Sequence, residues 1–159
     1  MKRYGQFCAV ARALDLVGDR WTLLIVRELL LRPSRFTDLL DGLPGVPRNL
    51  LAARLRTLAD EGLVEQEAGR YVLTARGLEL RPAIRALAMF GAAELTDGPD
   101  GDAVRGRWVR TAVDARFAGD EGVVVLEAGD EEVVLDLHGD ELRGPPEEVL
   151  QRLAQDVSA

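Results

Sequence analysis

The chain has little of what disulfide bonding, metal binding and catalysis require. Among its 159 residues there is one cysteine, Cys8, and one histidine, His138. A single cysteine excludes an intrachain disulfide and any zinc site built from several thiolates. His138 has no second histidine or cysteine near it in the sequence, so we expect no metal site there. Because a catalytic triad signature and a phosphate-binding glycine motif are also missing, we expect neither an enzyme nor a bound cofactor.

Long apolar segments are missing as well. The apolar run near the N-terminus, Trp21 to Val26, stops at Arg27-Glu28 and is too short to span a bilayer. The basic pair Lys2-Arg3 is not followed by the apolar core of a signal peptide. We therefore expect a cytoplasmic protein that does not bind membranes.

The charge is unevenly distributed. The net charge is −7, which by itself argues against a nucleic-acid binder. Residues 1–95 contain 14 Lys and Arg against 11 Asp and Glu, a net charge of +3, whereas residues 96–159 contain 6 against 16, a net charge of −10. This asymmetry predicts a basic binding module joined to an acidic one. DNA phosphates would repel the acidic half, so it is expected to lie away from DNA.

Apolar residues at helical spacing predict four helices before residue 61. The first covers about residues 7–17, and the second extends from an Asp19 cap to the stop at Arg32-Pro33. A helix of one or two turns begins at a Ser34 cap. After a Gly-Pro turn at residues 42–45, the fourth helix has Pro47 in its first position and runs to about residue 60.

A β-hairpin and a long helix are predicted next. Residues 63–66 and 71–74 are strand-like, and a glycine near the tip of the short loop between them indicates a hairpin. Thr74 is expected to cap a helix from about Arg76 to Leu95, with Pro82 early in it and with Leu80, Ile84, Leu87 and Gly91 on one face. This order of helices followed by a hairpin is typical of a winged helix-turn-helix.

The C-terminal part is predicted to be a second, smaller module. Residues 97–102 read as a linker because Asp, Gly and Pro dominate them. A helix at about 104–117, strands at 123–126 and 133–137, and a helix at 145–154 follow, although 109–113 also fits a strand. The fold class is therefore α+β, with a winged helix and dimerisation domain at 1–96 and a small acidic α+β module at 103–159. The module is marginal if it had to fold alone.

The fourth helix is the expected recognition helix. Leu51, Leu55 and Leu58 define its buried side, so Asn49, Ala53 and Arg56 face outward, with Ala52 at the border and Arg54 on the flank. Outward residues near the N-terminus of such a helix reach base edges in the major groove. Asparagine can pair with adenine, arginine with guanine or phosphate, and alanine can touch a thymine methyl group. The flank position of Arg54 suits a phosphate or an intrachain carboxylate as well as a base.

Three residues outside the helix complete the candidate interface. Arg35 and Thr37 are placed to bind backbone phosphate, and Arg70 at the wing tip could enter the minor groove. A merely solvated helix face would carry the same kinds of residue. The candidate DNA-binding residues are Arg35, Thr37, Arg48, Asn49, Ala52, Ala53, Arg54, Arg56 and Arg70.

Residues 7–95 resemble the HxlR-type winged helix regulators of bacteria. The matching pieces are Cys8 and segments 13–25, 35–39, 51–55, 62–64 and 73–77. The resemblance implies a transcriptional repressor that binds a pseudo-palindromic site in double-stranded DNA as a homodimer, built through the N-terminal helix and the helix after the wing. The chain departs from the family in having Pro47 where a Ser cap is usual, a short wing without proline, and an additional acidic module.

Two features could sense a signal. Cys8 aligns with a cysteine that some relatives of this family use to sense electrophiles or oxidants, although a lone cysteine on an apolar helix face is more often a small core residue. The C-terminal module faintly resembles a truncated sterol-carrier-like fold, which could hold a small-molecule effector in an apolar pocket. It fits equally well as an appendage that stabilises a dimer. The alternatives to DNA binding are a winged helix used for protein–protein interaction and a small-ligand-binding protein.

Overall fold

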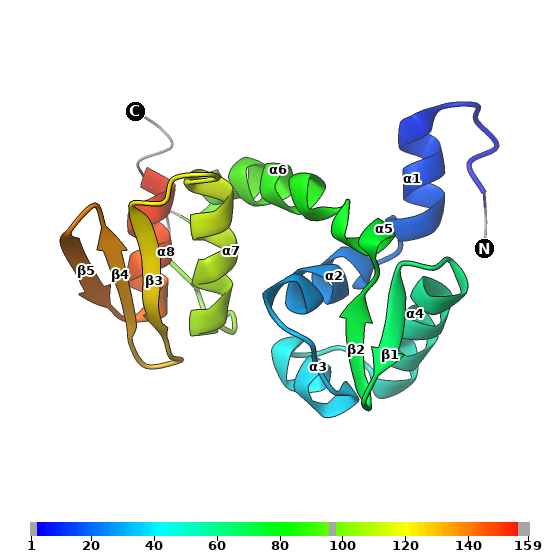
Figure 1. The fold of residues 1–159 in the computed structure, drawn as a ribbon, viewed down its shortest axis with the longest axis horizontal. Coiled ribbons are helices and arrows are strands. Elements are labelled where there is room, and N and C mark those ends of the chain that lie inside the picture. Colours follow the sequence, from blue (N-terminus) through cyan, green and yellow to red (C-terminus); the bar gives the residue numbers. More distant parts are fainter. Residues whose placement is uncertain (1–2, 96–97, 156–159) are drawn as a thin grey trace. The chain divides into compact units, whose positions relative to one another are not determined.

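The computed structural model describes residues 3–95 and 98–155 (Figure 1). Contacts divide the chain into two compact units, residues 1–81 and 82–159. The expected division had a linker at 97–102, of which Asp97 lies outside the described residues. The helix after the wing thus groups with the C-terminal unit, where Arg85 donates to the Asp114 carboxylate over 2.9 Å. Within the described residues, no helix has the length and hydrophobicity needed to cross a bilayer.

The first unit is the winged helix-turn-helix that the sequence predicts. Its core contains the fully buried Ile25, Leu39, Leu51, Leu55 and Leu58, which come from three successive helices. The elements are α1 (Ala9–Val17), α2 (Thr22–Leu31), α3 (Phe36–Gly42), α4 (Arg48–Asp60), β1 (Val64–Glu67), β2 (Arg70–Leu73) and α5 (Ala75–Leu78).

Two helix caps expected from the sequence are wrong. Trp21, with φ of 78°, is the residue that precedes α2, and the Asp19 carboxylate pairs with Arg54 instead, 2.8 Å away. Ser34 precedes the cap position of α3, and its backbone N–H and carbonyl pair with Tyr71 at 3.1 and 2.8 Å. The Asp19 side chain thus has a partner distant in sequence, whereas the Ser34 hydroxyl donates to the Arg32 carbonyl at 3.1 Å.

The wing is a tight antiparallel hairpin. Val64 pairs with Leu73 and Glu67 with Arg70, so only Ala68 and Gly69 form the loop. Their φ values of 47° and 77° are those of a type I′ turn, whose twist matches that of the flanking strands. The predicted hairpin is confirmed.

The single long helix expected after the wing is wrong. Thr74 does form the expected cap, because its Oγ1 accepts from the Gly77 N–H at 3.1 Å. However, α5 ends at Leu78, and the chain continues as α6 (Arg81–Gly91) and a 3₁₀ helix, η1 (Ala92–Leu95). A proline is accommodated in the first turn of a helix, where its missing N–H is not needed, so a new helix begins next to Pro82.

The second unit contains a three-stranded antiparallel sheet in the order β3-β4-β5. Helices α7 and α8 cover one face of the sheet (Figure 1), and Val109, Val133, Leu135, Val149 and Leu153 form the core between them. The elements are α7 (Gly106–Arg116), β3 (Val123–Ala128), β4 (Val133–Leu137), β5 (Asp140–Gly144) and α8 (Pro146–Gln155).

The sequence predicted all of these elements except β5. Strand β4 joins β5 through the two-residue turn His138-Gly139, with φ of 58° and 94°. Residue 140 thus begins a strand rather than continuing a turn. The resemblance of this unit to a sterol-carrier-like fold finds no support.

Candidate nucleic-acid interface

The exposed face of α4 is the one that helical periodicity predicts. Leu51, Leu55 and Leu58 are buried, whereas Arg48, Asn49, Ala53 and Arg56 are exposed and Ala52 is half-buried. Pro47, with φ of −66°, occupies the cap position one residue before the helix, instead of the first helical position expected. The free backbone N–H groups of the first turn favour a nearby anion. This face therefore combines cationic side chains with the positive end of a helix.

Three polar side chains on this face remain available to a ligand. The Arg48 guanidinium stacks on the Phe36 ring, with its carbon 5.3 Å from the ring centroid, which holds the side chain while leaving its N–H edges accessible. The Asn49 Oδ1 accepts from the Leu50 N–H at 3.0 Å, so its amide NH₂ remains available. Within the described chain, the guanidinium of Arg56 has no hydrogen-bond or ion-pair partner.

Arg54 instead connects α4 to the α1–α2 loop. One guanidinium nitrogen lies 2.8 Å from the Asp19 carboxylate, and Nε donates to the Arg20 carbonyl over 3.3 Å. Its side chain is 22% exposed. The sequence left open whether Arg54 binds a phosphate, a base or a carboxylate of its own chain. In the structure it binds a carboxylate of its own chain, that of Asp19.

The three candidate residues outside α4 differ in availability. Arg35 and Thr37 are both exposed at the start of α3, where the Asp38 carboxylate accepts from the Arg35 backbone N–H at 2.8 Å. Arg70 is exposed beside the wing tip, but its guanidinium is directed to the α2–α3 loop. It donates to the Pro33 carbonyl over 3.4 Å and lies 3.8 Å from the Asp38 carboxylate.

Sequence reasoning left out one exposed cation near this surface, Arg20. Its guanidinium lies over the Trp21 ring, 5.5 Å from the centroid, and its backbone carbonyl accepts from Arg54. The left-handed backbone of Trp21 is uncommon for a bulky residue. The signal that could have found Arg20 was its place in segment 13–25, which carries the family resemblance.

The division into two units leaves the charge asymmetry unchanged. Residues 1–81 contain 13 Lys and Arg against 10 Asp and Glu, a net charge of +3. Residues 82–159 contain 7 against 17, a net charge of −10. The unit that contains α4 is thus the basic one.

Cys8 is exposed, so the expectation that it is a core residue is wrong. It occupies the cap position of α1, before the helical positions that turn inward. The backbone N–H groups of Ala11 and Val10, in the first turn of α1, favour the thiolate and lower the pKa of Cys8 below its ordinary value.

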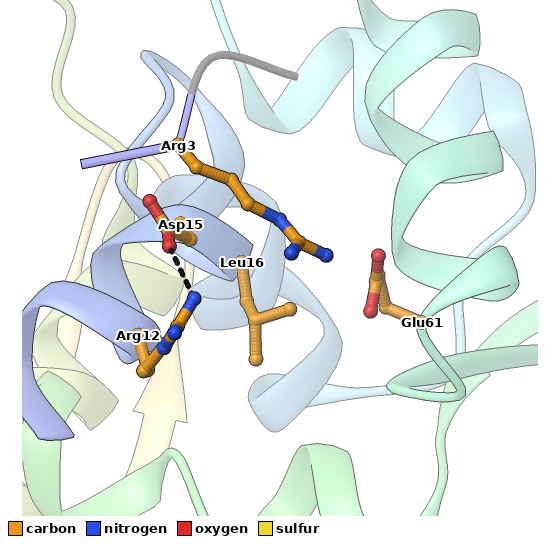
Figure 2. Close-up of a pocket in the computed structure, with 5 residues that line it drawn as sticks. All are labelled: Arg3, Arg12, Asp15, Leu16 and Glu61. Atoms are coloured by element: carbon orange, nitrogen blue, oxygen red, sulfur yellow. Dashed lines mark ion pairs between the residues drawn. The ribbon is translucent and has the colours of Figure 1, made fainter. Parts of the chain in front are cut away.

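The segment that carries Cys8 is held against α1 beside a charged cavity of about 440 Å³. The buried Asp15 carboxylate accepts from the Tyr4 backbone N–H at 2.9 Å and lies 3.8 Å from the Arg12 guanidinium. Figure 2 shows Arg3 and Glu61 directed toward each other across this cavity. Because Glu61 directly follows the last residue of α4, the N-terminal segment and the C-terminal end of α4 share one cavity.

Each unit also presents exposed apolar side chains. In the first unit, Phe7 directly before α1 is 103% exposed, and Val10 and Leu14 on α1 are exposed as well. On α6, Leu87 and Phe90 are exposed, although Leu87 was expected to share a face with Ile84, which is buried. We call these five residues the apolar stripes of α1 and α6.

Comparisons with known proteins agree with this architecture. The model of the family described as HxlR-like helix-turn-helix matches residues 16–98. An HTH-type transcriptional regulator of Mycobacterium bovis is 41% identical over 104 residues, which are 61% of this chain and 65% of that protein. Another, of Synechocystis sp., is 34% identical over 94 residues, which are 55% of this chain and 70% of that protein.

A solved structure shares the fold. The crystal structure of PA1607, described as a candidate transcription factor, superposes with a TM-score of 0.54 at 35% identity. The superposition covers 66% of this chain and 77% of that one. The chain spans about two thirds of the length of the mycobacterial relative, and residues 99–159 lie outside the family match.

Proposed function

Because the chain belongs to the HxlR-like helix-turn-helix family, we propose that it represses transcription by binding pseudo-palindromic operator DNA as a homodimer. Its relatives are DNA-binding transcriptional regulators and not enzymes, and this chain is a regulator of the same winged helix type. The observation that carries the proposal is the outward face of α4, where Arg48, Asn49 and Arg56 are exposed opposite a leucine core.

We assign the contacts on α4 by the exposure of each side chain. Asn49, Ala53 and Arg56 read base edges in the major groove, where asparagine pairs with adenine and arginine with guanine. Ala52, at the border, permits close approach of the helix to a thymine methyl group. Arg48, prepositioned by its stacking on Phe36, binds a guanine or a phosphate.

The remaining candidates position the protein on the backbone. Arg35 and Thr37 bind phosphates from the start of α3, and Arg70 enters the minor groove from the wing after giving up its weak contacts with the Pro33 carbonyl and the Asp38 carboxylate. Arg54 acts mainly by holding α4 against the α1–α2 loop through Asp19.

The test is the salt dependence of duplex binding. Fragments selected from the source genome supply the operator, and fluorescence anisotropy measures its affinity between low and physiological salt. Arg56→Ala is expected to weaken specific binding by about 1–3 kcal/mol and, where the residue touches phosphate, to reduce the salt slope by about one. Arg110→Ala removes an exposed charge from α7 in the acidic unit and serves as the matched control.

If no duplex binds at low salt, the regulator proposal fails and the winged helix is a protein–protein interaction module. If Arg110→Ala weakens binding as much as Arg56→Ala, the assignment of α4 is wrong although DNA binding stands.

The homodimer is supported by the apolar stripes of α1 and α6, because each stripe leaves a large side chain, Phe7 or Phe90, exposed where a partner subunit can bury it. A two-fold axis places two recognition helices on successive turns of DNA, which explains why a pseudo-palindromic operator is expected.

A second candidate function is the sensing of electrophiles or oxidants by the Cys8 thiol. The exposure of Cys8 and its lowered pKa support this role. A modified Cys8 would displace the segment that Tyr4 anchors to Asp15, and with it the cavity shared with the end of α4. The alkylation rate with iodoacetamide, followed against pH, should reach half its maximum at a lower pH than for the cysteine of an unfolded peptide, because the pKa of Cys8 is lowered. The alkylated protein should bind operator more weakly, whereas Cys8→Ser treated in the same way should not change. Equal operator affinity before and after complete alkylation would exclude the sensing role.

A further inference from the structure

A small cavity of about 180 Å³ lies within the C-terminal unit, between η1, the loop of residues 98–104, α7 and α8. Leu95, Pro99, Val104, Trp108 and Leu150 supply its apolar lining. An engineered cavity of about 150 Å³ is large enough for benzene. The cavity therefore suits a ligand with about one ring, and a four-ring sterol is too large for it.

Three carboxylates surround this apolar interior. Glu94, Asp102 and Glu147 line the cavity, and no lysine, arginine or histidine lies among the lining residues. Within the described part of the chain, none of the three forms an ion pair. Each carboxylate attracts a cation and repels an anion. An anion would meet three like charges there.

The loop that bears Asp102 is a defined turn. The Asp102 N–H donates to the Pro99 carbonyl at 2.7 Å, and Asp100 and Gly101 have φ of 41° and 85°, as in a type I′ turn. Gly98, with φ of 84°, lies so close to α8 that an added Cβ would be 3.5 Å from the Gln151 Nε2. The turn thus fixes the backbone that bears Asp102, an exposed residue, beside the apolar lining.

We propose that this cavity binds a small organic cation, with an apolar body of about one ring against Trp108 and an ammonium group among Glu94, Asp102 and Glu147. The ligand's role as an effector rests on the proposed regulatory function, so the test measures ligand binding in the absence of DNA.

Isothermal titration calorimetry on the full chain uses benzylammonium as the probe, with benzyl alcohol as its neutral counterpart and benzoate as its anionic one. Benzylammonium is expected to bind in the millimolar range, benzyl alcohol at least several-fold more weakly, and benzoate not measurably. Each exposed ion pair contributes about a two- to fivefold change, so Glu147→Gln should weaken benzylammonium binding by that factor. The combined variant Glu94→Gln/Asp102→Asn/Glu147→Gln should weaken it by about tenfold or more.

Glu148→Gln is the matched control, because Glu147 and Glu148 both lie in the first turn of α8 but only Glu147 lines the cavity. The proposal is overturned if benzylammonium gives no binding heat at tens of millimolar, if benzyl alcohol binds equally well, or if the two glutamine variants behave alike. Failure of the protein to bind DNA would refute the regulator proposal and leave the result at this cavity intact.

Discussion

Replacing Phe7 with serine is expected to dissociate the proposed homodimer without unfolding the subunit. Phe7 precedes α1 and is fully exposed, and Val10 and Leu14 extend the same stripe along the helix. Since no part of the described subunit covers the Phe7 ring, removing it takes nothing from the core of either unit. Any loss must therefore appear in self-association.

The size of the effect follows from the area that the ring can bury. Full burial of a phenylalanine side chain contributes about 1.5–3 kcal/mol. A two-fold interface contains two copies of the residue, so the variant loses about 3–6 kcal/mol of association free energy. At about 1.4 kcal/mol for each tenfold change, the dissociation constant of the dimer should rise by roughly two to four orders of magnitude.

Sedimentation equilibrium over nanomolar to micromolar concentrations measures this constant, and circular dichroism checks that the variant keeps its helices. Leu24→Ser is the control, because Leu24 is an exposed leucine on α2 outside the apolar stripes. Phe90→Ser tests the stripe of α6 in the same way. If the wild-type chain is monomeric at micromolar concentration, or if the Phe7 variant associates as tightly as the wild type, the assignment of the stripes to a dimer is refuted.

Three further predictions concern stability, each measured by urea unfolding against the wild type. Thr74→Ala should cost about 1 kcal/mol, because Oγ1 accepts from the Gly77 N–H and donates to the Gly62 carbonyl at 2.7 Å; an unchanged midpoint would show that the cap contributes nothing. Ala68→Gly should stabilise the wing by about 0.5–1 kcal/mol, because it relieves a left-handed alanine in the turn, and a loss of stability would contradict this. Gly77→Ala should cost about 1–3 kcal/mol or more, since its Cβ would lie 2.1 Å from the Leu63 carbonyl oxygen, and a neutral result would disprove the close packing there.

The sequence predicted the elements whose pattern is set by burial. Leu51, Leu55 and Leu58 repeat at helical spacing and are buried in the core. Because Asn49 and Arg56 lie on the opposite side of the same helix, their side chains face outward. The wing was predictable for a similar reason, since a glycine beside the tip permits the positive φ that a two-residue turn requires.

The errors occur where a distant residue decides local structure. Asp19 and Ser34 are good capping residues, but the Asp19 carboxylate pairs with Arg54, and the Ser34 hydroxyl donates to the Arg32 carbonyl at 3.1 Å while its backbone pairs with Tyr71. Strand β5 was missed because Leu142 is its only buried residue, so its apolar alternation is weak. Its pairing with β4 is set by the His138-Gly139 turn, where histidine adopts a positive φ more readily than most residues.

The positions of the arginines explain how a chain with a net charge of −7 can still bind DNA. Arg54 is held by Asp19, and its charge is largely compensated inside the protein. Arg48 is fixed by stacking and Arg56 has no partner in the described chain, so both charges remain for phosphates or bases. At physiological salt, the electrostatic interaction between exposed charges is largely screened beyond about 8 Å. A DNA phosphate at α4 would therefore be attracted by the cations close to it and repelled only weakly by carboxylates more than about 8 Å away. The total charge is therefore a poor guide to nucleic-acid binding, and under the proposed function the local charge on the exposed face of α4 decides it.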